Sequence, residues 1–165
     1  MKSLSSTTLT FFLITLSLML FSAGTAMAVT DSYSNQKVVY HVNYDDVKKQ
    51  SGTLRNIQNH LNALGPDNIK LKVVMHGNGL SMLLKPEALK NVPKFKAANA
   101  NSDMQQKIDT LKLQGVEFAV CANTVKGRNV NIDQDLYNVN QTDIVPSGVA
   151  ELASLQQQGF TYLRP

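Results

Sequence analysis

The chain has 165 residues, of which 43% are hydrophobic and 17% are charged, a composition typical of one globular domain. Its formal net charge of +4 is too small to indicate a nucleic-acid-binding protein, and it has no tryptophan. Because it has a single cysteine, no disulfide can form within the chain.

Residues 1–28 have the pattern of a signal peptide that is removed on export. A lysine follows the first methionine, residues 9–21 are mostly apolar, and Ala26-Met27-Ala28 has the small-x-small form of a cleavage site. The apolar run is too short to predict a stable membrane anchor, and an uncleaved anchor is the alternative. We therefore expect a periplasmic or secreted protein.

The next part of the chain places one helix between two strands. Residues 29–36 are polar and predict a flexible lead-in. Residues 37–43 are β-branched and apolar on both faces, as in an interior parallel strand. A helix begins as early as Asp46, carries leucine and isoleucine on one face, and ends at a Gly-Pro pair. Residues 69–75 predict the second strand.

A long irregular segment separates the second strand from the third. Residues 85–100 contain two prolines and four lysines, and they predict a surface loop with one helical turn. Its lysines are either simply solvated or available to an anion or an acidic partner. Ser102 and Gln105 have the form of a capping box at the start of a helix. Residues 116–120 then predict a buried strand that leads to Cys121.

The last part of the chain predicts two more strands around a helix. Residues 129–141 are polar, and residues 143–146 predict a poor, short strand. Ser147 is suited to cap a helix, and residues 160–163 predict the last strand. Strands that alternate with helices of this length indicate a parallel sheet with helices on both faces. We assign this domain to residues 37–165.

Cys121 lies where the third predicted strand ends. Asn123 and Thr124, both favourable helix N-cap residues, follow it and predict the start of a helix or turn. Free backbone N–H groups and the positive end of a helix dipole favour a thiolate at such a position. The alternative is a buried cysteine that acts as a small hydrophobic residue. The local pattern leaves both interpretations open.

Polar residues follow the first, second and third predicted strands, at residues 37–43, 69–75 and 116–120. The carboxyl ends of parallel strands lie along one edge of a sheet, where ligands bind. We therefore expect catalytic roles for Cys121 and His76, and ligand-binding roles for Asn43, Asn78 and Asn123. A histidine near a cysteine lowers the thiol pKa or moves its proton. A structural role in the turn after the second strand is the alternative for the histidine.

Other site motifs are missing from the sequence. The glycines after the second strand lack the third glycine of a dinucleotide fingerprint, and there is no Walker lysine, so we expect no cofactor. His41, His60 and His76 have no metal-ligand spacing, so we expect no metal site. We expect His41 to be a hydrogen-bonded core residue and His60 to lie on the surface. Asp45 and Asp46 are expected to complement a helix dipole.

An ordered set of segments resembles the DsrE/DsrF-like family. The set comprises VVMHG at residues 73–77, GVEFAVCANT at residues 115–124, IVPSGVAEL at residues 144–152 and QQGFTY at residues 157–162. None of these motifs is highly specific alone, but together the resemblance covers nearly all of residues 37–165.

The resemblance implies a fold and a chemistry. The fold is a three-layer α/β/α sandwich with a mainly parallel sheet of about five strands, often assembled into trimers or hexamers. In the better understood members, a cysteine at the position that matches Cys121 carries sulfur as a persulfide and passes it to a partner protein. The sequence therefore favours an exported sulfur carrier or sulfurtransferase-like protein. The alternative is a non-catalytic, oligomeric binding or scaffold protein with an inert cysteine.

Export predicts a mature N-terminus at Val29 or within a residue or two of it, because the small-x-small cleavage pattern ends at Ala28. N-terminal sequencing of the protein from a periplasmic or secreted fraction checks this expectation. A chain that still begins at Met1 and stays in the membrane would contradict it.

Overall fold

The computed structural model describes residues 33–165, so the predicted signal peptide (1–28) and the first half of the predicted lead-in (29–36) lie outside the described residues. Within them, five strands form one sheet in the order β4-β3-β2-β1-β5, and every neighbouring pair is parallel. The strands are β1 (Gln36–Val42), β2 (Ile69–Met75), β3 (Glu117–Cys121), β4 (Ile144–Val145) and β5 (Thr161–Leu163).

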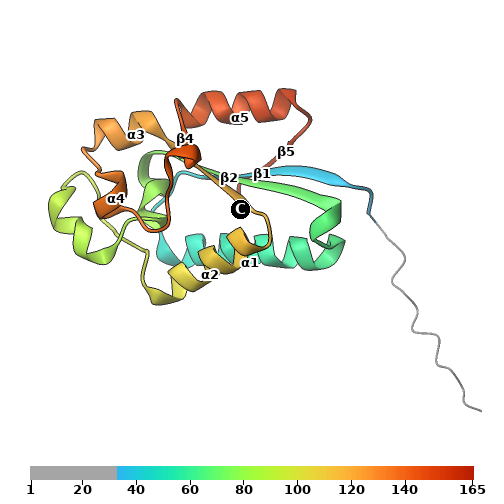
Figure 1. Cartoon of the computed structure of the whole chain (residues 1–165), viewed down its shortest axis with the longest axis horizontal. Helices are drawn as coiled ribbons and strands as arrows, with labels where there is room; N and C mark the ends of the chain where they lie inside the picture. The colour runs from blue at the N-terminus through green and yellow to red at the C-terminus, as the bar shows by residue number, and fades with distance from the viewer. Residues whose placement is uncertain (1–32) are drawn as a thin grey trace, which may run out of the picture. The chain divides into compact units, whose positions relative to one another are not determined.

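Helices cover both faces of this sheet, with α1 and α2 on one face and α5 on the other (Figure 1). The helices are α1 (Val47–Leu64), α2 (Ser102–Leu113), α3 (Ala122–Gly127), α4 (Ile132–Asp135) and α5 (Gly148–Gln157). Short 3₁₀ turns are η1 (Pro66–Asn68), η2 (Gly77–Met82), η3 (Pro86–Asn91) and η4 (Gln141–Asp143). The expected three-layer α/β/α sandwich with a five-stranded parallel sheet is therefore confirmed.

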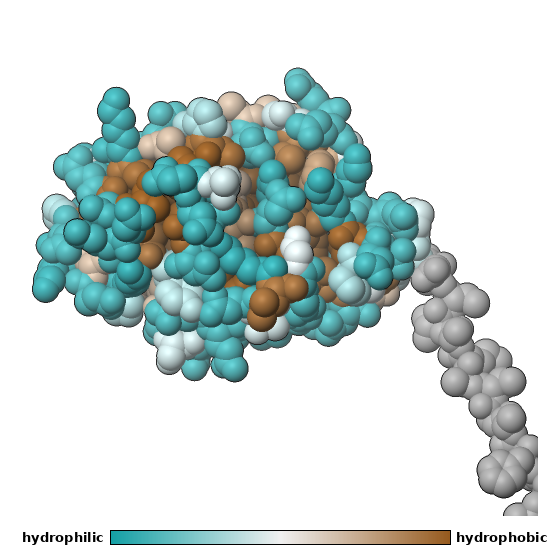
Figure 2. Space-filling model, in the orientation of Figure 1, coloured by the Kyte–Doolittle hydropathy of each residue, from teal (hydrophilic) through white to brown (hydrophobic). Residues whose placement is uncertain are grey.

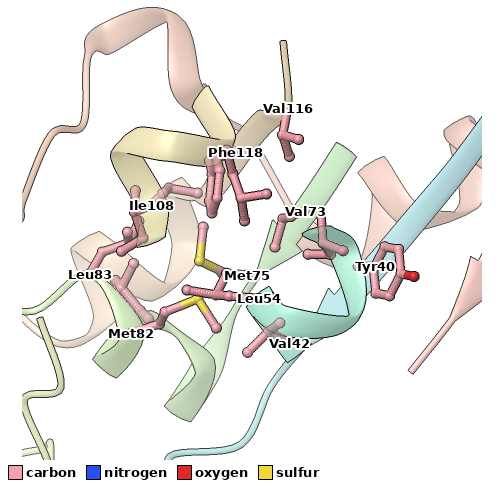
Figure 3. Close-up of a cluster of buried hydrophobic side chains, with 14 of the residues drawn as sticks. Tyr40, Val42, Leu54, Val73, Met75, Met82, Leu83, Ile108, Val116 and Phe118 are labelled. Atoms are coloured by element: carbon pink, nitrogen blue, oxygen red, sulfur yellow. The ribbon is translucent and has the colours of Figure 1, made fainter. Parts of the chain in front are cut away.

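The two faces of the sheet bury different amounts of apolar surface. Strand side chains alternate between the faces, so the larger core lies between the sheet and the two helices α1 and α2 (Figure 3). Each fully buried aliphatic side chain there contributes roughly 1.5–3 kcal/mol. Under α5 the apolar cluster is smaller and consists of Val39, Val74, Ala119, Leu152, Leu155 and Phe160. The α5 face therefore leaves room for polar side chains.

The face of the molecule shown in Figure 2 is mainly hydrophilic, with smaller hydrophobic areas between polar side chains. Large apolar side chains that remain exposed include Leu113 at the end of α2 and Val149 on α5. No helix within residues 33–165 has both the length and the apolar character needed to span a membrane.

The start of α1 is as predicted, whereas the start of α2 differs by one residue. Asn101, not Ser102, caps α2, because its side chain accepts a 3.0 Å hydrogen bond from the Met104 N–H. Gln105 donates to the Ala100 carbonyl at 2.7 Å instead of completing the predicted capping box. Asparagine and serine are both favourable caps, and the sequence alone did not separate two adjacent candidates.

Two polar segments differ in how well they were predicted. Residues 85–100 form an irregular connection with one short helix, η3, as expected, but they do not lie wholly at the surface, because Val92, Phe95 and Ala100 are buried. Residues 129–141 contain the helix α4, which the sequence analysis missed. Its ends are held by side chains: Asn131 accepts from the Gln134 N–H, and Asp135 accepts from the Asn131 N–H. Such a helix has no apolar periodicity that would reveal it.

A buried polar network joins the long connection after β2 to the start of α1. Gln50 is fully buried and donates to the Tyr44 carbonyl at 2.7 Å and to the Ser81 hydroxyl at 2.8 Å. Asn99 donates to the Gln50 side-chain oxygen at 2.8 Å and to the Asp45 carbonyl at 2.9 Å. Buried polar groups need such partners, so this network fixes the path of the connection.

Asn99→Ala should lower the free energy of unfolding by roughly 1–3 kcal/mol, because it leaves the buried Gln50 oxygen without a donor. Urea denaturation followed by circular dichroism measures the change. The matched control is Asn91→Ala at an exposed position of the same connection, with an expected change within about 0.5 kcal/mol. Equal effects of the two substitutions would contradict the proposed importance of the network.

Candidate functional site

The register of the central strands brings His76 and Cys121 together. Met75, the last residue of β2, pairs with Val120 of β3. His76 and Cys121 each come one residue later, so they stand at the same level on adjacent parallel strands and project to the same face. That face is the one covered by α5.

Gly148, the first residue of α5, lies against both of these residues. A Cβ atom at this position would be 3.0 Å from the His76 Cβ and 3.2 Å from the Cys121 Cβ, closer than side chains ordinarily pack. The absence of a side chain therefore lets the start of α5 approach the two strand ends. It also brings the Gly148 N–H, one of the unpaired N–H groups at a helix start, to the cysteine.

Cys121 is a buried residue, with a relative exposure of 5%, and several hydrogen-bond donors act on its thiol. Burial raises its pKa, but the Gly148 N–H, the Thr124 hydroxyl and N–H, and the Asn123 N–H together lower it by more, so the pKa lies below its ordinary value. Donors from the starts of two helices thus converge on one sulfur and favour the thiolate.

Asn123 and Thr124 do not cap helix α3, contrary to the prediction from sequence. Helix α3 begins at Ala122 and Cys121 occupies the N-cap position, so both residues lie within the first turn. They were expected to cap the helix with their side chains. Their N–H groups are among those that α3 leaves unpaired, and they lower the pKa of Cys121, although its side chain accepts no capping hydrogen bond from them.

Thr124 links the sulfur to the turn after β2. Its hydroxyl oxygen accepts a 2.9 Å hydrogen bond from the Gly77 N–H. With that lone pair occupied, the hydroxyl proton is available to Cys121. Gly77 adopts a φ of 56°, a conformation that favours glycine, and this turn directs its N–H toward the threonine.

His76 belongs to a chain of three hydrogen-bonded side chains. Its Nε2 lies 2.8 Å from Nε2 of His41, and Nδ1 of His41 lies 2.6 Å from the Tyr162 hydroxyl. Burial lowers the pKa of both histidines, and for His41 the neighbouring His76 and Arg164 lower the pKa further, to about 4. Both rings are therefore neutral at pH 7.

The three asparagines assigned to ligand binding share no hydrogen-bond partner. Asn43 accepts from Arg164 through its side-chain oxygen, at 2.8 and 3.1 Å, and Asn78 accepts from Arg128 at 2.7 Å. The side chain of Asn123 is exposed, and only its N–H faces Cys121. Their ligand-binding roles stay predictions.

The other histidines behave in two different ways. His41 is a buried, hydrogen-bonded residue of β1, as expected. His60 was expected at the surface, but it is half-buried and lies between the Tyr40 hydroxyl at 3.0 Å and the Gln36 side-chain oxygen at 2.8 Å. No cluster of three histidine, cysteine or acidic side chains within residues 33–165 is placed to hold a metal ion.

Three residues of the site were missed or misassigned from sequence: Thr124, Gly148 and Tyr162. A usable signal existed for one of them, because Gly148 follows the predicted cap Ser147 and so was a candidate for the first, unpaired N–H of a helix. No comparable signal pairs β1 with β5, the contact that joins the tyrosine to the histidines.

Thr124→Val should raise the pKa of Cys121, because it removes the hydroxyl donor but keeps the branched shape. A hydrogen bond to a charged group is worth roughly 1.5 kcal/mol or more, so alkylation by iodoacetamide at pH 7 should slow by roughly tenfold. The pH dependence of alkylation, followed by mass, measures both effects.

Two control variants accompany this experiment. Thr124→Ser keeps the hydroxyl and should retain the wild-type pH profile. Thr110→Val removes an exposed hydroxyl on α2 and should also leave the profile unchanged. A Thr124→Val protein with a wild-type profile would show that the hydroxyl does not stabilise the thiolate.

Comparisons with known proteins agree on one family and one fold. The structure is similar to MTH1491 from Methanobacterium thermoautotrophicum, described as a protein of unknown function, with a TM-score of 0.62 and 26% identity, covering 79% of this chain and 99% of that one. It is also similar to the ychN protein from E. coli, with a TM-score of 0.56, 16% identity and the same coverage. Comparison with curated proteins gave no match. The sequence matches the DsrE/DsrF-like family over residues 36–165, and the chain therefore belongs to this family.

Proposed function

We propose that this protein handles sulfur or thiols through Cys121, as a carrier that accepts a sulfane sulfur and passes it to a partner protein. The observation that supports this proposal is the group of donors around the sulfur, which lowers the pKa of the thiol in spite of its burial. A structural cysteine needs no such donors, whereas a nucleophilic or persulfidated cysteine carries a negative charge that they stabilise.

The proposed transfer needs no added oxidant. The Cys121 thiolate attacks the outer sulfur of a persulfide R–S–SH, a new S–S bond forms, and the S–S bond of the donor breaks. The donor leaves as the thiolate R–S⁻, which then takes a proton, and Cys121 holds the transferred sulfur as a persulfide. A partner thiolate attacks that outer sulfur in the second step, and Cys121 leaves as a thiolate stabilised by the same donors.

Export to the periplasm or beyond, and assembly into a trimer or hexamer, are further parts of this proposal. They rest on the pattern of residues 1–28 and on the resemblance to assembled family members. The competing proposal is a scaffold or binding protein with an inert cysteine. The low exposure of Cys121, at 5%, favours that alternative, so the accessibility of the native thiol separates the two.

Incubation of the native protein with a low-molecular-weight alkyl persulfide should add the mass of one sulfur atom, because the activated Cys121 thiolate accepts the outer sulfur. Intact-mass spectrometry measures the addition, and a thiol-containing acceptor should then remove it. Cys121→Ser is the control and should gain nothing. A wild-type protein that gains sulfur only after denaturation would overturn the carrier proposal and leave the scaffold proposal in place.

A further inference from the structure

Three hydrogen-bonded side chains lead from the cysteine site to the edge of the sheet. They come from three segments: His76 follows β2, His41 lies on β1, and Tyr162 lies on the edge strand β5. The two contacts along the chain are 2.8 and 2.6 Å long. His41 is 7% exposed, whereas Tyr162 is 38% exposed. This row of hydrogen-bonded side chains thus connects the buried His41 to Tyr162, whose exposure lets it exchange protons with water.

Each contact in this chain must contain one proton, and this requirement leaves two arrangements. In the first, Tyr162 donates to Nδ1 of His41, Nε2–H of His41 donates to His76, and His76 carries its own proton on Nδ1. In the second, every donor and acceptor is exchanged, and Nδ1 of His76 is a free acceptor. The first arrangement becomes the second when one proton shifts along each of the two hydrogen bonds, Nδ1 of His76 gives up its proton, and water supplies a new proton to the tyrosine oxygen.

The end of the chain at His76 is free to react. Nδ1 of His76 has no hydrogen-bond partner among the described residues. Every fully buried side-chain nitrogen and oxygen within residues 33–165 has a partner, so this nitrogen keeps at least some exposure to solvent. His76 and Cys121 both lie against Gly148. A group that reacts with the cysteine therefore arrives beside an imidazole that either gives or takes a proton.

A single histidine that had to become charged would be a poor proton donor or acceptor at this position. Burial disfavours the charged ring, and Arg164 faces His41 from the C-terminal end of the chain, so an imidazolium is costly at either ring. The shift between the two arrangements moves a proton without leaving a charged ring behind. Burial and Arg164 therefore disfavour a charged ring at His41 or His76, but they allow a proton to pass through the two rings while both end neutral.

We propose that His76, His41 and Tyr162 form a proton relay that serves the reactions of Cys121 and protonates the thiolate that leaves when the cysteine attacks an alkyl disulfide or persulfide. This inference rests on the proposed function of the cysteine. His76 touches the leaving group, and His41 and Tyr162 are positioning residues that act through it.

In the reaction with a disulfide R–S–S–R, the relay delivers one proton to the leaving group. The Cys121 sulfur bonds to one sulfur of the disulfide, the S–S bond of the disulfide breaks, and the leaving R–S⁻ takes the proton from Nδ1 of His76. Nε2 of His76 takes the proton of His41, Nδ1 of His41 takes that of Tyr162, and water restores the tyrosine hydroxyl. Cys121 is oxidised to the mixed disulfide, and the departing sulfur is reduced to a thiol.

Two neutral disulfides test the relay, because they differ in how much their leaving group needs a proton. Bis(2-hydroxyethyl) disulfide releases a basic alkyl thiolate, whereas 4,4′-dithiodipyridine releases a stabilised thiopyridone. Tyr162→Phe should slow the reaction with the alkyl disulfide by about tenfold and leave the aromatic reaction unchanged. The wild-type alkyl reaction should also show a solvent deuterium isotope effect that the variant loses.

Two further variants make the result specific. Tyr137→Phe, which removes a tyrosine hydroxyl bonded to Asp109 on α2, is the matched control and should react like wild type with both reagents. His41→Gln retains a donor and an acceptor but cannot exchange them, so it should behave like Tyr162→Phe. Tyr162→Phe that slows both reagents equally, or neither, would overturn the relay. Failure of native wild-type protein to react with either reagent would instead overturn the proposed function.

Discussion

The parallel pairing of β2 with β1 and β3 is the constraint on which the rest of the site depends. It aligns Met75 with Val42 on one side and with Val120 on the other, and so brings three strand ends to one edge. A shift of one residue would turn His76 and Cys121 toward opposite faces. The apolar core under α1 and α2 fixes this register, since the same shift would expose its buried side chains.

Much of the fold could be predicted because its signals are local or repeated. Runs of β-branched residues marked the buried parallel strands, and leucine spacing marked α1. The element that was missed, α4, is held by the polar side chains of Asn131 and Asp135, which have no periodic pattern. The cap of α2 was misplaced because Asn101 and Ser102 are adjacent and chemically similar candidates. Errors therefore fell where polar geometry, not burial, decides the structure.

The candidate site could be predicted only in part. Some of its residues are recognisable from their place after a predicted strand, whereas others join the site only through the order of the strands in the sheet. Cys121 and His76 could be predicted, since both lie at the carboxyl end of a strand in a parallel sheet. Tyr162 was not, because nothing in the sequence places the last strand beside the first. His41 was recognised as a buried histidine, but its partner on each side depends on that same strand order. The unpaired N–H of Gly148 reaches the sulfur only once the angle of α5 is known.

The neutral histidine pair also makes the folded state sensitive to acid. In the folded chain the pKa of His41 is lowered to about 4, chiefly by burial, whereas an unfolded chain has an ordinary histidine pKa of about 6.5. As the pH falls through this interval, the unfolded chain binds a proton that the folded chain does not, and the free energy of unfolding decreases. Protonation would also place two positive rings side by side between β1 and the end of β2, and it would remove the acceptor at Nδ1 of His41 that Tyr162 of the edge strand β5 can use. Acid should therefore loosen the C-terminal edge of the sheet before it disrupts the apolar core on the opposite face.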